Sequence, residues 1–458
     1  MSTPVRDVVL VAGASGFIGR ALGPALAARF TPVGLSRRDR AGADGYDRFV
    51  RCDLLSLEDT ERALVGARYA VYLAHSMMPA SRLTQASFAD LELLCADNFA
   101  RAAAAAGVER IVYLGGLHAE GALSPHLQSR LDVEHVLAGT GVPVTVLRAG
   151  LVLGAAGSSY QIVARLVRRL PLMVCPAWTH TRTQPVALAD VVALLAFAVG
   201  DAGTAGGVYD IGTPEVVSYL EIMKAVAAKT GANRRFLEVP LFSPGLSRLW
   251  LSLVTGAPRA LAGPLVESLR HEMVARDARL AEAAGLVPTS FDAALTAAID
   301  EEARGSAPFA FATGRVARSR TVISIQRMRL PPGRDAAWAA LAYPRWCARA
   351  LRWLLRVEVD DDGTARFRLR LGGRVMLMLA PARRAADRFL YRVAGGALAR
   401  PGQAGTFEVR SLGDGTLLTI VRDFEPRLPW WIYRTTQAVA HGWIMRAFGR
   451  WLGRGAPE

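Results

Sequence analysis

Three glycines placed between an apolar run and a helical segment constrain this chain more than any other feature. Asp7–Ala12 is a continuous β-type run, and Gly13, Gly16 and Gly19 follow it at intervals of three residues. In such a motif the first glycine permits a tight turn, and the second lets the backbone approach a phosphate closely. The third allows the helix to pack closely on the strand. The free N–H groups at the start of the next helix attract an anion. The motif therefore predicts a strand–turn–helix unit that binds the pyrophosphate of a dinucleotide.

Alternating β-type and helical stretches continue to about residue 150. The expected strands are 7–12, 32–35, 49–52, 69–73, 111–114 and 144–147, and the expected helices are 19–29, 57–65 and 90–106. Further helices are expected at 186–199 and 219–231, followed by a mostly helical stretch at 241–286. Strands that alternate with helices in this way form a parallel sheet with helices on both faces. The predicted fold class is therefore α/β, with a Rossmann-type doubly wound sheet.

The composition changes sharply near residue 319. The chain from Ser319 onward carries 24 arginines, no lysine and 11 acidic residues, whereas the first 318 residues carry 31 basic and 29 acidic residues. Seven of the nine tryptophans also lie beyond Ser319. Residues 301–320 mix Gly, Pro, Ser and Arg without a clear period, which is typical of a linker. The predicted domains are therefore 1–300 and 321–458, joined by a linker at 301–320.

The C-terminal region shows the pattern of an antiparallel sheet. One strand at 321–328 precedes a helical segment, Ala336–Arg356; about six short strands then alternate with glycine-containing turns, and a long helix is expected at Trp430–Leu452. This order is similar to the α+β helix-grip fold of START-type lipid-binding and polyketide-cyclase-like domains. The resemblance implies a curved sheet around the terminal helix and an apolar cavity for a small, lipid-like molecule. His441 lies on the terminal helix and is more typical of a core or surface histidine than of a ligand-binding one.

The end of the second expected strand indicates which dinucleotide is bound. Ser36, Arg37 and Arg38 stand there, and no acidic residue occurs before Asp39. An acid at this position binds the ribose 2′-hydroxyl of NAD, whereas arginine binds the 2′-phosphate of NADP. The sequence therefore favours NADP over NAD, with solvated surface arginines as the alternative interpretation.

Several motifs in the right order resemble the atypical, extended-type short-chain dehydrogenase/reductase superfamily over residues 5–300. They are the glycine turn, Asp53-Leu54, Tyr72–His75, Val112–Gly116, Leu147–Gly150 and Gln184–Val191. The resemblance implies that two groups of residues contact the cofactor. Ser15, Phe17 and Ile18 belong to the glycine turn. The others stand at the ends of later strands: Asp53, Leu54, Ala74, His75 and Gly115. It also implies that Tyr160 and Gln184 lie on the substrate side.

The catalytic residues differ from those of the family. Active members use a Tyr-x-x-x-Lys pair, and this chain contains none. His126 and Arg130 have the same spacing, one helical turn apart. A histidine transfers protons near neutral pH, whereas an arginine holds an anion or a ribose. The pair resembles that of a bacterial branch of atypical reductases, and two interpretations remain open: an oxidoreductase acting on a carbonyl-type or apolar substrate, or a non-catalytic NADP-binding regulator, redox sensor or assembly factor.

Other features restrict the remaining classes of function. The four cysteines are far apart in sequence and show no metal-binding spacing, so neither a disulfide framework nor a metal site is expected. The N-terminus shows no signal-peptide pattern, and the charge-free stretch 149–164 is too short and polar to span a bilayer, so a cytoplasmic protein is expected. The arginines form no nucleic-acid motif, and no nucleic-acid partner is expected. Arg366, Arg368 and Arg370 leave contact with an anionic membrane surface open.

Overall fold

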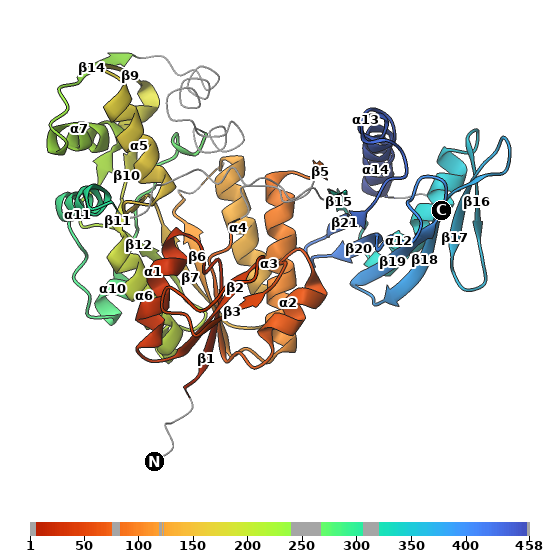
Figure 1. The fold of residues 1–458 in the computed structure, drawn as a ribbon, viewed down its shortest axis with the longest axis horizontal. Coiled ribbons are helices and arrows are strands. Elements are labelled where there is room, and N and C mark those ends of the chain that lie inside the picture. The colour runs from red at the N-terminus through yellow and green to blue at the C-terminus, as the bar shows by residue number, and fades with distance from the viewer. Residues whose placement is uncertain are drawn as a thin grey trace. The chain divides into compact units, whose positions relative to one another are not determined.

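The computed structural model describes residues 6–75, 83–118, 121, 123–239, 267–305 and 320–455. The chain forms two compact units (Figure 1). The first unit comprises residues 1–77 and 92–313, and the second comprises residues 78–91 and 314–458. The second unit thus includes a short segment that precedes the expected linker by more than two hundred residues. Most of the helical stretch predicted at 241–286, and residues 306–319 of the linker, lie outside the described residues.

The first unit is built on a seven-stranded parallel sheet. Its strand order is β12-β7-β6-β4-β1-β2-β3, which reverses direction between β1 and β4. The strands are β1 Val8–Ala12, β2 Thr31–Ser36, β3 Arg48–Arg51, β4 Tyr69–Tyr72, β6 Arg110–Gly116, β7 Val144–Ala149 and β12 Val208–Ile211. The predicted doubly wound sheet is therefore confirmed, and its switch point lies beside the glycine turn that follows β1.

Helices cover both faces of this sheet. On β1, Val9 and Val11 pack on one face with α1 (Phe17–Ala27), α6 (Leu188–Gly200) and α10 (Arg279–Ala283). Leu10 and Ala12 pack on the other face with α2 (Leu57–Leu64), α3 (Phe88–Ala105) and α4 (Pro125–Ala138). Successive side chains of a strand point to opposite faces, so a continuous apolar run is what a sheet covered on both sides requires.

A separate apolar cluster lies beside the main sheet. It joins α5 (Ser158–Arg169), α7 (Tyr219–Lys229) and α11 (Phe291–Ala303) with β8 (Val152–Leu153) and β9 (Leu172–Pro176). The remaining short strands here are β10 Arg182–Thr183, β11 Val186–Ala187, β13 Val217–Ser218 and β14 Arg235–Val239. The helix predicted from residue 186 begins only at Leu188, because β11 pairs with β8.

The second unit contains an eight-stranded sheet in the order β16-β17-β18-β19-β20-β21-β15-β5. Its strands are β5 Leu83–Gln85, β15 Val322–Arg329, β16 Leu355–Val359, β17 Ala365–Leu369, β18 Val375–Arg384, β19 Arg388–Gly395, β20 Thr406–Ser411 and β21 Thr416–Phe424. Neighbours from β16 to β15 are antiparallel, and β5 pairs parallel with β15 at the edge. The sequence predicted the antiparallel strands, whereas β5 was not predicted.

The helices of the second unit differ from those that the sequence predicted. The first, α12, covers Ala336–Ala350, because the chain from Leu355 pairs with β17 as strand β16. The predicted terminal helix is two helices, α13 (Trp430–Thr435) and α14 (Gln437–Gly453), because the backbone of Thr436 leaves the helical region at φ −121° and ψ −80°. The START-like assignment stays a prediction.

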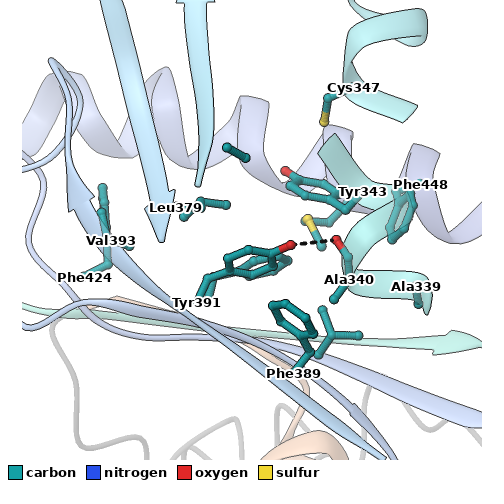
Figure 2. Close-up of a cluster of buried hydrophobic side chains, with 14 of the residues drawn as sticks. Ala339, Ala340, Tyr343, Cys347, Leu379, Phe389, Tyr391, Val393, Phe424 and Phe448 are labelled. Atoms are coloured by element: carbon teal, nitrogen blue, oxygen red, sulfur yellow. Dashed lines mark hydrogen bonds between the residues drawn. The ribbon is translucent and has the colours of Figure 1, made fainter. Parts of the chain in front are cut away.

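Aromatic side chains fill the core of the second unit. Figure 2 shows Phe389 and Tyr391 of the sheet beside Tyr343 of α12 and Phe448 of α14. The hydroxyl of Tyr391 donates a hydrogen bond to the Ala340 carbonyl at 3.3 Å, and burial raises the pKa of that tyrosine to about 12. The hydrogen bond lets a buried tyrosine satisfy its polar atom within an apolar cluster.

Within the described residues, no helix is long and apolar enough to cross a membrane. The stretch 149–164 contributes instead to β7, β8 and α5. All four cysteines are free and buried, and the same described ranges hold no group of three or more His, Cys, Asp or Glu side chains placed to bind a metal.

Candidate nucleotide-binding and catalytic site

The glycine turn has the backbone geometry that its spacing predicted. Gly13 has φ +91°, and a Cβ there would lie 2.8 Å from the carbonyl carbon of Leu73 at the end of β4. A Cβ on Gly19 would lie 2.3 Å from the Gly13 oxygen, so α1 packs directly on the turn. Gly16 is exposed, and its Cβ would contact only the Gly13 oxygen at 3.1 Å. Gly13 and Gly19 are thus required by the fold, whereas Gly16 leaves open space on the solvent side.

The first turn of α1 offers donors for an anion. Gly16 is the N-cap and provides no side-chain cap, and the turn contains no acidic residue. The unpaired N–H groups of a helix start carry partial positive charge and bind phosphate. Ser15, Phe17 and Ile18 supply the surrounding backbone. Arg20, which the sequence reasoning missed, donates from Nε to the Ser15 carbonyl at 3.0 Å and adds a positive charge beside the turn.

The residues predicted to select NADP lie at the end of β2, next to β1. Ser36 ends the strand, and its hydroxyl accepts a hydrogen bond from the Arg38 N–H at 3.2 Å. Arg37 and Arg38 are exposed, and neither forms an ion pair within the described part of the chain. Asp39 lies 3.9 Å from Arg51, so the nearest acid faces another partner. Two free guanidiniums here fit a phosphate group.

The residues predicted on the adenosine side surround the same edge of the sheet. The Asp53 carboxylate accepts the Leu55 N–H at 3.1 Å and so fixes the turn after β3. The Leu54 carbonyl accepts a hydrogen bond from the Asn98 side chain at 2.7 Å. Ala74 follows β4 directly above Gly13. These contacts hold the strand ends in place, and their role toward a cofactor stays a prediction.

Four side chains of the first unit meet in a largely buried cluster: His75, Glu92, His126 and Arg130. The His75 Nδ1 lies 2.7 Å from one Glu92 oxygen, and the Arg130 guanidinium pairs with the other. The rings of His75 and His126 contact edge to face, with centroids 5.4 Å apart. Ser124 caps α4 by accepting the Leu127 N–H at 3.2 Å and thereby fixes where His126 sits on the helix.

Burial controls the charges in this cluster. Burial lowers the pKa of His126 below its usual value, and burial with the charge of Arg130 and the neighbouring His126 holds the pKa of His75 well below its usual value. Both rings are therefore mainly neutral at pH 7. Burial also lowers the pKa of Arg130 to about 10, so the guanidinium stays charged. The cluster combines a fixed ion pair with a neutral imidazole that can accept a proton.

Gly115 and Gly116 end β6 beside α4. A Cβ on Gly116 would lie 3.6 Å from the Arg130 Cγ, an ordinary van der Waals distance. The Arg130 stem thus packs along the end of β6. The backbone carbonyl of Arg130 also accepts a hydrogen bond from the buried Tyr113 hydroxyl at 3.1 Å. Arg130 is therefore held at three points: its charge, its stem and its backbone.

The two residues predicted on the substrate side have other partners in the structure. The buried Tyr160 hydroxyl donates to Glu302 at 2.8 Å, and burial raises its pKa above the usual value. The Gln184 side chain donates to the Thr213 carbonyl and accepts the Ala275 N–H at 2.8 Å. These bonds occupy both side chains within the protein. Their role toward a substrate stays a prediction.

Glu92 is a second residue that sequence reasoning missed, after Arg20. Its side chain is only 2% exposed, and it bridges Arg130 and His75. The available signal was a single acid within the apolar stretch LELLCA (91–96) on a helix. An isolated carboxylate on a buried helix face needs a cationic partner. Such a signal predicts that a partner exists, although it does not identify Arg130.

Comparison with known proteins agrees with this geometry. Residues 13–169 match a protein family described as NAD(P)H-binding. Auxiliary protein GraX of Staphylococcus aureus (strain NCTC 8325 / PS 47) is 31% identical over 114 residues, which are 24% of this chain and 37% of GraX. The chain thus aligns with little more than a third of that relative.

Solved structures share the fold of the first unit. An NADPH-dependent quinone oxidoreductase from Escherichia coli, QOR2, solved with NADPH, has a TM-score of 0.50 and 20% identity, and the match covers 63% of this chain and 98% of that one. The first unit has an NAD(P)-binding Rossmann-type fold. MoeE5, solved with UDP-glucose and NAD, matches with a TM-score of 0.50 and 21% identity over 66% of this chain and all of that one. Since relatives of this fold bind either cofactor, the fold alone does not select NADP.

Proposed function

We propose that this protein is an atypical short-chain dehydrogenase/reductase that binds NADP and transfers hydride between NADPH and a carbonyl-type or other apolar substrate. The observation that carries the proposal is the glycine turn, where open space at Gly16 adjoins the uncapped N-terminus of α1. At the end of the neighbouring strand β2, Arg37 and Arg38 are exposed and have no ion-pair partner in the described residues. When bound, the nicotinamide supplies or accepts the hydride. The second unit holds the apolar substrate or a lipid-like ligand, a role supported by its element order of a strand, a helix, an antiparallel sheet and a C-terminal helical segment.

Each part of the first unit has a distinct task in this proposal. The turn and the start of α1 hold the pyrophosphate, and Ser36, Arg37 and Arg38 hold the 2′-phosphate. His126 moves the proton that accompanies hydride transfer, and Arg130 is a positioning residue, since Glu92 fixes its charge. Arg130 itself cannot exchange a proton, because its pKa of about 10 keeps it charged at neutral pH.

A second candidate is a non-catalytic NADP-binding regulator, redox sensor or assembly factor. One observation favours it: the guanidinium that would replace the family's lysine is paired with a buried carboxylate. Turnover of NADPH with a panel of carbonyl compounds, measured beside NADPH affinity, distinguishes the two. Binding without turnover across the panel supports the regulator.

Replacement of Gly16 by valine is expected to weaken NADPH binding at least tenfold. The new side chain needs only a small shift of the Gly13 oxygen to fit, yet it fills the open side where the pyrophosphate approaches. Isothermal titration calorimetry measures the affinity, and circular dichroism verifies folding. A folded Gly16→Val protein with the affinity of the parent chain would refute the proposed phosphate site. The same change at Gly19 is a poor probe, because its Cβ would clash with backbone at 2.3 Å.

The double change Arg37→Ala, Arg38→Ala is expected to weaken NADPH by about 10- to 100-fold, the value of one or two charge-assisted hydrogen bonds. NADH lacks the 2′-phosphate, so its affinity should change less than twofold. The matched control is Arg48→Ala, an exposed arginine on the neighbouring β3 that pairs with Asp47 at 3.2 Å. Equal losses for NADPH and NADH would mean that Arg37 and Arg38 do not read the phosphate.

A further inference from the structure

Two of the three arginines that the sequence placed on one basic strand face have acidic partners in the structure. On β17, Arg366 lies 2.7 Å from Asp360 and Arg368 lies 2.9 Å from Glu358, both on or beside the neighbouring strand β16. The basic strand face predicted from alternation is therefore largely neutralised by its neighbour. Four arginines without a carboxylate partner in the described residues lie at one end of the β16–β17–β18 sheet.

Two loops form this end, which we call the sheet tip. Residues 351–354 join α12 to β16, and residues 370–374 join β17 to β18. The Arg370 N–H donates to the Leu354 carbonyl at 2.9 Å, and the Arg370 guanidinium donates to the Arg352 carbonyl at 3.2 Å. The two loops are thus tied together and present one surface.

The sheet tip carries large apolar side chains in solvent. Leu371 is 90% exposed, Trp353 is 73% exposed and Leu354 is also exposed. Leu371 stands next to Gly372 and Gly373, whose φ values of +79° and +60° make a tight hairpin turn that only glycine adopts readily. A turn of this kind usually carries polar residues, so an apolar side chain at its apex indicates a contact surface.

Arginines surround these apolar side chains without acidic neighbours. Arg349, Arg352, Arg370 and Arg374 are exposed, and none of them pairs with a carboxylate within the described ranges. The segments 349–357 and 369–376 contain no Asp or Glu. Tryptophan and leucine flanked by arginine match the headgroup region of a bilayer, where apolar side chains enter the acyl boundary and cations meet lipid phosphate.

We propose that the sheet tip docks the protein onto an anionic lipid bilayer. Leu371, Trp353 and Leu354 insert at the interface, while the four arginines contact the negatively charged headgroups. The partner is a lipid surface because it can bury the apolar side chains of the tip and pair its arginines at the same time. A nucleic acid or an acidic peptide would pair the arginines and leave Leu371 in water. The proposal stands independently of nucleotide binding.

The test uses the full-length protein and sedimentation with vesicles of phosphatidylcholine containing 30 mol% phosphatidylserine, a chosen composition. Binding to these vesicles, with none to pure phosphatidylcholine, is expected. Trp353→Ser, Leu371→Ser should lower the partition coefficient at least tenfold, since burial of such side chains drives interfacial binding. Arg370→Glu, Arg374→Glu should lower the partition coefficient by more than about 25-fold, because each arginine lost from an anionic surface weakens binding about fivefold.

Trp443→Ser is the matched control, because Trp443 is similarly exposed at 67% but lies on α14, outside the sheet tip. Vesicle binding by this variant should stay within twofold of the parent chain. Equal loss in this control, or full binding by the Trp353→Ser, Leu371→Ser protein, would overturn the proposal. So would a DNA duplex that binds the apolar double variant as tightly as the parent chain and displaces the vesicles, because the arginines would then serve nucleic acid.

Discussion

Replacement of Glu92 by glutamine is expected to lower the free energy of unfolding by about 3–5 kcal/mol, since removing one partner of a buried ion pair leaves the other charge uncompensated. Glutamine keeps the shape of the side chain but loses its charge. The buried guanidinium of Arg130, held by its stem and its backbone carbonyl, then has no carboxylate facing it. Urea unfolding followed by circular dichroism measures the change.

Two further variants separate the ion pair from a general packing effect. Glu92→Gln combined with Arg130→Met removes both charges and should recover part of the lost stability, because replacing both partners by uncharged groups costs less than breaking the pair. Glu238→Gln breaks half-exposed contacts with Lys224 and His180 and should cost at most about 1 kcal/mol. If the double variant is as unstable as Glu92→Gln, the lost charge balance is not the cause.

Replacement of His126 by alanine is expected to lower turnover by about 10²- to 10⁴-fold, the usual contribution of a general acid–base residue. NADPH affinity should stay within twofold, because the glycine turn and the β2 end are untouched. His135→Ala is the control, since His135 is exposed on the same helix α4. Full turnover by the His126→Ala protein would exclude His126 as the proton-transfer residue.

The pH dependence of turnover provides a second readout for His126. Burial lowers the pKa of this histidine, so its neutral form predominates at pH 7 and is lost only as the pH falls through that lowered value. Alcohol oxidation needs the neutral form and should decline as the pH falls through that lowered pKa, whereas carbonyl reduction needs the protonated form and should rise there. Steady-state kinetics of kcat/KM against pH should show this dependence in the parent chain and not in His126→Ala.

Local constraints explain why the glycine turn could be predicted. A positive φ at Gly13, the open side at Gly16 and the tight packing at Gly19 all depend on backbone within seven consecutive residues. The alternation of apolar runs and helical stretches likewise reports which faces are covered, because side-chain direction repeats every two residues in strands and about every 3.6 in helices. The sheet and its first turn therefore followed from the sequence.

The partners of charged groups depended on the tertiary structure. Spacing placed His126 and Arg130 on one helix face, but only packing of α3 against α4 brought Glu92 to Arg130, 38 residues away in sequence. Similarly, the alternation of arginine with apolar residues predicted a basic face on β17. In the structure, the β16–β17 register places acidic residues beside Arg366 and Arg368.

Strand order is the other feature that the sequence left undetermined. Three residues, Leu83–Gln85, join the edge of a sheet whose next strand begins at Val322. A strand this short has no periodic pattern to identify it, and its hydrogen bonds are made by backbone groups that every residue shares. Side-chain periodicity determines which face of an element is buried, whereas the three-dimensional packing of distant elements decides what each face meets.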